Sequence, residues 1–232
     1  MLRAIIFDFN GVLVDDEPLH FRLFQRVLGE EGLPLSEDDY YDRYLGLDDR
    51  GCFTEVLESA GREVSPPHLA RLVARKAAYY RDEIRKSGFP FFVGAVELVR
   101  SCVARPWTLA LVSGALRDEV EGALGQEDLG SCFKLLVTAE DVERTKPDPE
   151  GYRRALEGLN ALPPLPERLL HPHEVVAIED SPAGLEAAAG AGLRTLGVAH
   201  TYPASQLTPA DAVVASVEGL RAERLESLIE PG

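Results

Sequence analysis

The chain has 232 residues and a formal net charge of −15; 45% of its residues are hydrophobic and 27% are charged, as in folded globular proteins. The acidic excess argues against a nucleic-acid-binding protein and against a protein of anionic membrane surfaces, because both need basic side chains, and no apolar run approaches the roughly 20 residues of a membrane span. Three scattered cysteines suit neither a zinc site nor a disulfide framework, so we expect a cytoplasmic location.

Short apolar runs and longer helix-like stretches follow one another along the chain. The first run, 2–9, lacks a helical period and ends in an acid, which predicts a buried strand. Helical patterns then occupy 19–31, 37–45, 50–60 and 66–86. In the remainder, helices are predicted at 94–104, 116–125, 149–158 and 182–191, and strands at 108–113, 134–139, 174–180, 194–199 and 211–216. The Pro-rich stretch 160–173 is predicted to be a surface loop.

The alternation of strands and helices predicts an α/β fold with a doubly wound parallel sheet covered on both faces. Residues 15–92 interrupt this alternation with helices alone, which indicates an inserted helical domain. We therefore expect a core domain of 1–14 and 93–232 and a helical domain of 15–92. Because the insertion is entered and left through neighbouring linkers, it is suited to move as a lid.

Polar residues follow several of the predicted strands, at the edge where ligands of such sheets bind. Asp8 ends the first strand, Ser113 the second, and Glu179 and Asp180 the fourth, while a turn contributes Lys146. Three converging carboxylates repel one another unless a cation lies among them, and hard oxygen ligands favour Mg²⁺. A lysine and a serine suit phosphoryl oxygens, and a free carboxylate is able to form an aspartyl-phosphate.

Four motifs, DFNGVLVD, LVSG, TKPDP and IEDSPAG, resemble in sequence and order those of the haloacid-dehalogenase-like hydrolases. The resemblance covers nearly the whole chain, and the helical insertion resembles that family's helical cap. Within the family, the chain is most similar to β-phosphoglucomutase and related sugar-phosphate phosphatases, through the stretches DEPLHFRLF, GLDDR and ARKAAYY. The resemblance implies a Rossmann-like core and Mg²⁺-dependent phosphoryl transfer.

The resemblance also implies roles for single residues. Asp8 resembles the nucleophile, and the metal ligands are expected to be Asp8, the backbone carbonyl of Asn10, Glu179 and Asp180. The phosphate-holding pair is expected to be Ser113 and Lys146. Five further residues are expected to bind substrate: Gly114 and Arg117 in the core, and His20, Arg50 and Lys76 in the insertion. Of these, Arg50 and Lys76 resemble contacts to a distal anionic group, and His20 resembles a hinge residue near the acid/base position.

Asn10 departs from the family pattern, which has an aspartate two residues after the nucleophile. That aspartate protonates the leaving oxygen and later activates water or a sugar hydroxyl, whereas an amide has no proton that titrates near neutrality. Three explanations are open. The protein is a slow or specialised phosphatase in which His20 or a water substitutes, it binds phosphometabolites without turning them over, or the asparagine was introduced to trap the site.

We expect phosphoryl transfer from a small phosphorylated metabolite through Asp8, most simply by a monomeric phosphatase without nucleic-acid or membrane partners. Two alternatives remain, a non-catalytic phosphometabolite-binding protein and a β-phosphoglucomutase-like mutase. Residues 62–86 contain seven Lys or Arg against three acids. This basic segment is suited either to steer an anionic substrate or to form a solvated helix face.

Overall fold

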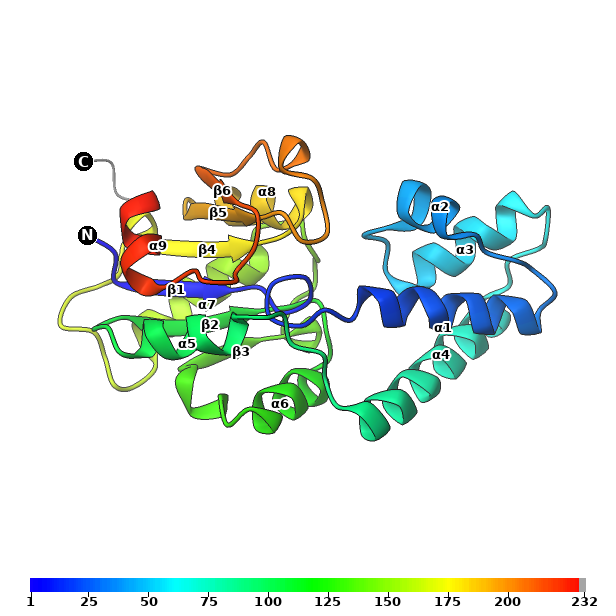
Figure 1. Cartoon of the computed structure of the whole chain (residues 1–232), viewed down its shortest axis with the longest axis horizontal. Helices are drawn as coiled ribbons and strands as arrows, with labels where there is room; N and C mark the ends of the chain where they lie inside the picture. Colours follow the sequence, from blue (N-terminus) through cyan, green and yellow to red (C-terminus); the bar gives the residue numbers. More distant parts are fainter. Residues whose placement is uncertain (230–232) are drawn as a thin grey trace. The chain divides into compact units, whose positions relative to one another are not determined.

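The computed structural model describes residues 1–229, with side chains up to Glu226, and it divides into two compact units (Figure 1). The core unit contains Met1–Asp15 and the chain from Phe89 onward. The helical unit contains Asp16–Gly88. That the helical unit serves as a cap for the core stays a prediction.

A six-stranded parallel sheet forms the centre of the core unit within the described residues. Its strands are β1 (Ala4–Phe7), β2 (Thr108–Val112), β3 (Leu135–Val137), β4 (Val175–Glu179), β5 (Arg194–Val198) and β6 (Ala212–Val214). They lie in the order β3-β2-β1-β4-β5-β6, and Ala4 is the partner of both Thr108 and Val175. The predicted α/β fold with a parallel sheet is confirmed, and each predicted apolar run contains a strand.

Helices of the core unit follow the strands as predicted. They are α5 (Ala95–Val103), α6 (Arg117–Gln126), α7 (Glu150–Ala161), α8 (Pro182–Gly190) and α9 (Ala222–Ile229). Short 3₁₀ helices lie at η2 (Gly130–Cys132), η3 (Ala139–Asp141), η4 (Pro172–Glu174) and η5 (Ala204–Gln206). The sequence pattern did not predict α9, which is only eight residues long and therefore carries little periodicity.

Alternating side chains of the strands face two separate hydrophobic layers, as the two-residue period of a strand requires. Ile5 and Phe7 pack in the cluster that includes α5, α6 and α9. Ala4 and Ile6 pack in the cluster that includes α7 and α8. Figure 1 shows these helices on the two faces of the sheet. The sheet is therefore buried on both faces, and its carboxyl edge is left to carry polar groups.

The helical unit has a hydrophobic core of its own, built from residues of all its helices except α2. The elements are α1 (Glu17–Glu30), α2 (Glu37–Asp39), the π-helix η1 (Tyr40–Tyr44), α3 (Asp49–Ser59) and α4 (Pro66–Ser87). The sequence predicted one helix over 37–45. The structure instead widens after α2 into a π-turn, in which the Leu45 amide donates to the Tyr40 carbonyl at 2.9 Å and Tyr40 and Tyr44 are both buried.

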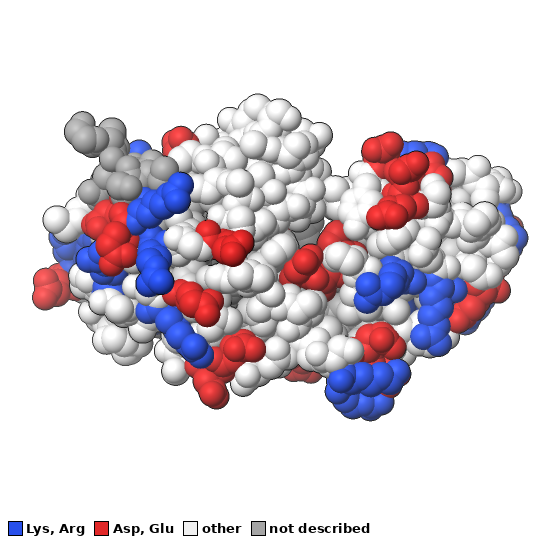
Figure 2. Space-filling model, viewed as in Figure 1, with Lys and Arg blue, Asp and Glu red and all other residues white. Residues whose placement is uncertain are grey.

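Charged side chains of both signs are mixed over the visible surface (Figure 2). In the basic segment 62–86, Arg75 pairs with Glu30 and Glu31, and Lys86 pairs with Asp82. These ion pairs offset part of the positive charge that the sequence suggested for substrate steering. Across residues 1–229, the helices are too short or too polar to span a bilayer.

Candidate active site

Asp8 lies directly after β1. β1 is an inner strand of the sheet, between β2 and β4. The Asp8 amide donates to the Ile178 carbonyl at 3.0 Å, which extends the pairing of β1 with β4 by one residue. The side chain is buried. A carboxylate at this position is held by two flanking strands at the edge where doubly wound sheets bind their ligands.

Glu179 ends β4, and Asp180 follows it before α8 begins. Ser181 caps that helix by accepting the Gly184 amide at 3.1 Å. Asp8, Glu179 and Asp180 each offer a carboxylate oxygen within 4.8 Å of the others, and all three residues are buried. The strand order brings them together from opposite ends of the sequence, as the strand-end argument predicted.

The electrostatic cost of this cluster is visible in the pKa values. Burial, followed by the charge of Glu179, raises the pKa of Asp8 well above its ordinary value. The same two causes raise the pKa of Asp180 to about 7. Desolvation and like charge both disfavour ionised carboxylates, and a bound divalent cation reverses both effects. The donor set of three oxygens therefore fits a hard cation such as Mg²⁺.

Lys146 lies among the carboxylates. Its Nζ atom is 2.7 Å from Asp8 Oδ1 and 2.7 Å from Glu179 Oε1, and it donates to the Val112 carbonyl at 3.3 Å. Burial lowers the pKa of this ammonium, but the adjacent Asp8 and Glu179 carboxylates outweigh burial and raise the pKa above its ordinary value. Lys146 is therefore charged at neutral pH and offsets part of the negative charge of the cluster.

Glu179 has one oxygen with partners and one without. Oε1 accepts from Lys146 Nζ and from the Tyr152 hydroxyl. Oε2 is buried and has no hydrogen-bond partner. An unpaired buried carboxylate oxygen is costly, because it has lost water without gaining a donor. A cation in the cluster would satisfy this oxygen, which is the second observation that fits a metal here.

Gly11 shapes the loop between Asn10 and Val14. It has a φ of +76°, and a Cβ built on it would lie 1.9 Å from Asp180 Oδ2. The glycine thus permits both the left-handed backbone and the close approach of the loop to Asp180. Its amide donates to the Val14 carbonyl at 2.9 Å, which fixes the peptide plane that carries the Asn10 carbonyl.

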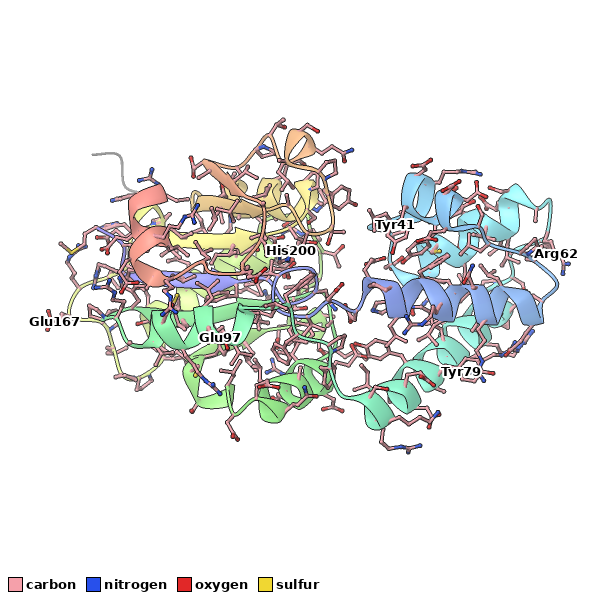
Figure 3. All side chains as sticks on the ribbon, in the orientation of Figure 1. Tyr41, Arg62, Tyr79, Glu97, Glu167 and His200 are labelled. Carbon is pink, nitrogen blue, oxygen red and sulfur yellow. The ribbon has the colours of Figure 1, made fainter. Side chains whose placement is uncertain are left out.

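His200, in the turn after β5, contacts the same loop through the Gly11 carbonyl (Figure 3). Its Nε2 accepts from the Val217 amide at 3.3 Å, so the ring proton is on Nδ1, which donates to the Gly11 carbonyl at 2.8 Å. The ring stacks on Phe92 with centroids 3.8 Å apart. Burial lowers the pKa of His200, which favours this neutral form. The next residue, Thr201, hydrogen-bonds Asp180.

Ser113 follows β2 and is buried beside the nucleophile loop. Its Oγ donates to Asn10 Oδ1 at 3.5 Å and accepts from the Ala115 amide at 2.9 Å. Ser113, Gly114, Lys146 and Tyr152 line one small cavity. The structure therefore brings the expected phosphate-holding pair, Ser113 and Lys146, to one place beside Asp8.

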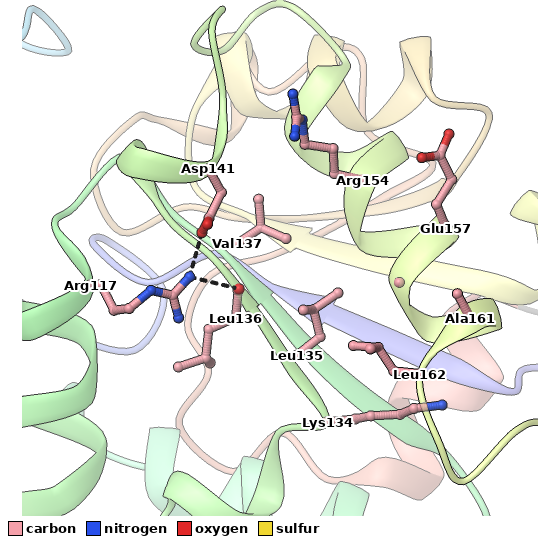
Figure 4. A pocket seen from close by; sticks show the side chains of 11 residues that line it. Arg117, Lys134, Leu135, Leu136, Val137, Asp141, Arg154, Glu157, Ala161 and Leu162 are labelled. Atoms are coloured by element: carbon pink, nitrogen blue, oxygen red, sulfur yellow. Dashed lines mark hydrogen bonds and ion pairs between the residues drawn. The ribbon is translucent and has the colours of Figure 1, made fainter.

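Arg117 lies in different surroundings from those residues. It forms an ion pair with Asp141 and donates to the Leu136 carbonyl at 3.4 Å, and it lines a cavity of about 540 Å³ along the edge strand β3 (Figure 4). It does not belong to the lining of the cavity shared by Ser113 and Lys146. A contact between Arg117 and the substrate stays a prediction, with no support from this geometry.

Within the helical unit, two of the three expected substrate residues are in contact. Lys76 is buried, with its Nζ 2.5 Å from Asp49 Oδ1 and 2.7 Å from His20 Nδ1. His20 Nε2 is 3.3 Å from Asp16 Oδ2, so His20 bridges a cation and a carboxylate. Arg50 is exposed near the start of α3.

Sequence reasoning missed Tyr152, His200, Thr201 and Asp49 as neighbours of the predicted site residues. Tyr152 is on the buried face of α7, where its spacing is the same as that of a core aromatic. His200 and Thr201 follow an apolar strand, a position that the strand-end rule could have singled out. Asp49 directly precedes Arg50, and no spacing rule distinguishes it from Asp48.

Residues 5–198 match the family described as haloacid dehalogenase-like hydrolase, and the chain belongs to this family. It is 33% identical over 201 residues to the phosphorylated carbohydrates phosphatase of Thermotoga maritima, and the aligned stretch covers 86% of this chain and 87% of the relative. It is 29% identical over 225 residues to the validoxylamine A 7'-phosphate phosphatase of Streptomyces hygroscopicus subsp. limoneus, and the aligned stretch covers 95% of this chain and 97% of that relative. The predicted family and the prediction of a hydrolase are confirmed.

The fold also resembles solved structures. The β-phosphoglucomutase of Clostridium difficile matches with a TM-score of 0.81 at 22% identity, covering 99% of this chain and 97% of that one. CbbY from Rhodobacter sphaeroides, solved in complex with phosphate, matches with a TM-score of 0.78 at 23% identity, covering 94% and 95%. At these identities the matches establish the architecture alone.

Proposed function

We propose that the protein is a Mg²⁺-dependent phosphatase of phosphorylated carbohydrates that works through an aspartyl-phosphate on Asp8. The observation that carries this proposal is the buried cluster of Asp8, Glu179 and Asp180 around the Lys146 ammonium. The substrate class rests on the similarity to the Thermotoga maritima phosphatase. In the helical unit, Arg50 is exposed and able to meet a second anionic group, whereas Lys76 is buried and already paired with Asp49.

In the proposed reaction, an Asp8 carboxylate oxygen attacks the phosphorus, the bond from phosphorus to the ester oxygen breaks, and the sugar leaves as an alkoxide that takes a proton from water. Water then attacks the aspartyl-phosphate, which releases orthophosphate and regenerates Asp8. The metal would be held by Asp8, the Asn10 carbonyl, Glu179 and Asp180, and when bound it neutralises charge on the phosphoryl oxygens.

Lys146 has to change partners during this reaction. In the structure its ammonium is occupied by Asp8 and Glu179 at 2.7 Å each. A phosphoryl group next to Asp8 offers anionic oxygens that accept strong hydrogen bonds from a cation. The Lys146 ammonium already lies among the carboxylates, so it exchanges these partners for the phosphoryl oxygens without moving into the site. Ser113 donates to the same group, because its hydroxyl proton is held only by a weak 3.5 Å contact to Asn10.

Asn10 keeps the second candidate function open. An amide at this position leaves nucleophile, metal ligands and phosphate-holding residues intact but supplies no proton to the leaving oxygen. A protein that binds phosphometabolites without turning them over would have this arrangement. A mutase would also need an acid and base at this position, so Asn10 argues against the mutase alternative more strongly than against a slow phosphatase.

Release of orthophosphate from a panel of sugar phosphates tests the proposal, with Mg²⁺ and with EDTA. We expect slow, Mg²⁺-dependent release by the wild-type protein and none by Asp8→Asn. Binding of the same sugar phosphates without any release by the wild type would instead support the binding-protein function. Release that persists in Asp8→Asn would contradict the assignment of the nucleophile.

A further inference from the structure

Tyr152 lies in α7 and reaches the acidic cluster with its hydroxyl. It is among the largest fully buried side chains of the described residues. Its hydroxyl donates to Glu179 Oε1 across 27 residues of sequence, and its ring lies 5.6 Å from Lys146 Nζ. Tyr152 therefore contacts both a proposed metal ligand and the proposed phosphate-binding lysine, without itself belonging to either set.

The hydroxyl of Tyr152 is a donor under all ordinary conditions. A phenol carries its proton near neutral pH, and this proton is directed at Glu179 Oε1. A donor of this kind costs little to fix, because the aromatic ring is already buried in the hydrophobic layer of α7 and α8.

Glu179 Oε1 accepts from two donors at the same time. One is the Tyr152 hydroxyl and the other is Lys146 Nζ at 2.7 Å. On the other side, Glu179 packs against α8, since a Cβ built on Gly184 would lie 2.0 Å from Oε2. The carboxylate is thus confined between Tyr152 and the backbone of α8, with Oε2 unpaired.

When Lys146 transfers its hydrogen bonds to a phosphoryl group, Glu179 Oε1 keeps a partner only if Tyr152 remains. Without the hydroxyl, Oε1 would have to retain Lys146 or stay buried and unpaired, and both outcomes carry an energetic cost. The Tyr152 hydroxyl thus allows Lys146 to leave while the orientation of Glu179 is preserved.

Resting on the proposed function, we propose that Tyr152 is a positioning residue, which holds Glu179 ready for the metal and frees Lys146 to bind the phosphoryl group. It acts through Glu179 and Lys146, which its hydroxyl and its ring contact. Outer hydrogen-bond partners of metal ligands fix ligand orientation, and their loss typically reduces metal affinity by about 10- to 100-fold.

Tyr152→Phe removes one oxygen and retains the packed ring, so the variant should fold. Calorimetric titration of Mg²⁺ into metal-free protein measures the effect directly. We expect the Kd for Mg²⁺ to rise by about 10- to 100-fold in Tyr152→Phe. In the presence of enough Mg²⁺ to fill the site, we expect orthophosphate to bind more weakly to the variant as well, because Glu179 retains Lys146.

Tyr79→Phe is the matched control. It removes a tyrosine hydroxyl that donates to Glu30 Oε1 at 2.9 Å on the surface of the helical unit, and it should leave both affinities unchanged. Melting temperatures in EDTA separate positioning from packing. We expect Tyr152→Phe to melt within a degree or two of the wild type, since Lys146 still satisfies Glu179 in the metal-free protein.

Wild-type Mg²⁺ affinity in Tyr152→Phe would overturn the inference. So would a loss of affinity accompanied by an equally clear fall of the melting temperature in EDTA, because this combination marks a packing defect. Asp180→Ala tells this failure apart from failure of the proposed function. If the wild type and Asp180→Ala bind Mg²⁺ equally, the metal site itself is assigned wrongly, and the role of Tyr152 is overturned with it.

Discussion

In the proposed reaction, the residue at position 10 is the one expected to supply the proton for the leaving oxygen. Asn10 is held beside Ser113, a proposed phosphate-binding residue, and its peptide plane is fixed through the Gly11 amide. In the proposed reaction, attack by Asp8 on the phosphorus therefore has its geometry in place. Departure of a sugar alkoxide does not, because an alkoxide is a poor leaving group unless it is protonated.

Asn10→Asp should change turnover according to the leaving group. We expect sugar-phosphate turnover to rise by roughly 10²-fold or more, the size of a restored general acid and base. Nitrophenyl phosphate leaves as a stable anion, so its phosphorylation step should gain much less. Single-turnover kinetics separate this step from the hydrolysis of the aspartyl-phosphate, which also needs a base. Equal gains for both substrates would contradict the leaving-group argument.

The clustering of the candidate site residues was predictable where a strand ends in a polar side chain. Asp8, Ser113, Glu179 and Asp180 all follow apolar runs, and a parallel sheet brings such positions to one edge. Tyr152 was not predictable in the same way. Whether a buried tyrosine has a hydroxyl partner depends on side-chain packing between α7 and β4, which leaves no periodic trace in the sequence.

At the scale of single elements, the start of α8 is fitted closely to Glu179. Ser181 caps the helix, and the first turn contains Gly184, whose Cα packs against the Glu179 carboxylate. Any side chain at position 184 would enter the space of that carboxylate, because real Cβ contacts of 2.0 Å do not occur. The helix therefore needs glycine here for the orientation of the glutamate and not for backbone freedom.

Gly184→Ala should thus displace Glu179. We expect a loss of about 1–3 kcal/mol in the free energy of unfolding, as for other overpacked cores, and weaker Mg²⁺ binding. Gly125→Ala is the matched control, since a Cβ at this position in α6 meets nothing within 4 Å and should stabilise the protein by about 0.4–1 kcal/mol. Denaturant unfolding of both variants measures the contrast, and equal effects would contradict the close fit.

The connection between α7 and β4 is held by one buried carboxylate. Glu174 accepts from both Nη atoms of Arg168 and from the His171 amide at 3.0 Å, and Arg3 adds a longer contact of 3.4 Å. These hydrogen bonds, with the Arg168 contact the largest cause, lower the pKa of Glu174 from 4.5 to about 2. The Pro-rich stretch predicted as a surface loop is thus tied to the sheet through Glu174.

Because the pKa of Glu174 is lower in the folded protein, its contribution to stability is complete above pH 4.5 and is lost as the pH falls toward 2. Glu174→Gln should therefore be less stable than the wild type at pH 7. The difference in the free energy of unfolding should shrink steadily between about pH 4.5 and 2. Denaturant unfolding across this range measures the difference, and a pH-independent gap would show that the charge of Glu174 is not responsible.

Secondary-structure elements were predictable where the sequence carries one clear signal, such as a continuous apolar run. Strands that are buried on both faces give continuous apolar runs, and all of these runs contained strands. The stretch 37–45 gave a helical signal, but the signal does not distinguish an α-turn from the π-turn at η1. That choice depends on how Tyr40 and Tyr44 pack in the core of the helical unit, which the local sequence does not encode.

At the scale of the whole molecule, the chain forms two units with separate hydrophobic cores. Val27, Phe53 and Leu72 belong to the core of the helical unit, whereas the sheet and its helices form the clusters of the core unit. Two chain crossings, at 15–16 and 88–89, connect them. Units with separate cores are expected to unfold with some independence. The proposed metal site belongs entirely to the core unit.

Mg²⁺ should therefore stabilise one part of the molecule selectively. A ligand that binds only the native state stabilises that state by about 2.7 kcal/mol when the free ligand concentration is 100 times the Kd. For a unit of this size, this stabilisation raises the melting temperature by roughly 5–10 °C. Differential scanning calorimetry with Mg²⁺ and with EDTA should show this rise for the transition of the core unit, while the transition of the helical unit stays in place. Asp180→Ala should remove the rise, because it lacks a proposed ligand. A single transition that rises as a whole would indicate that the two units unfold as one. The absence of any rise in the wild type would contradict a metal site built from Asp8, Glu179 and Asp180.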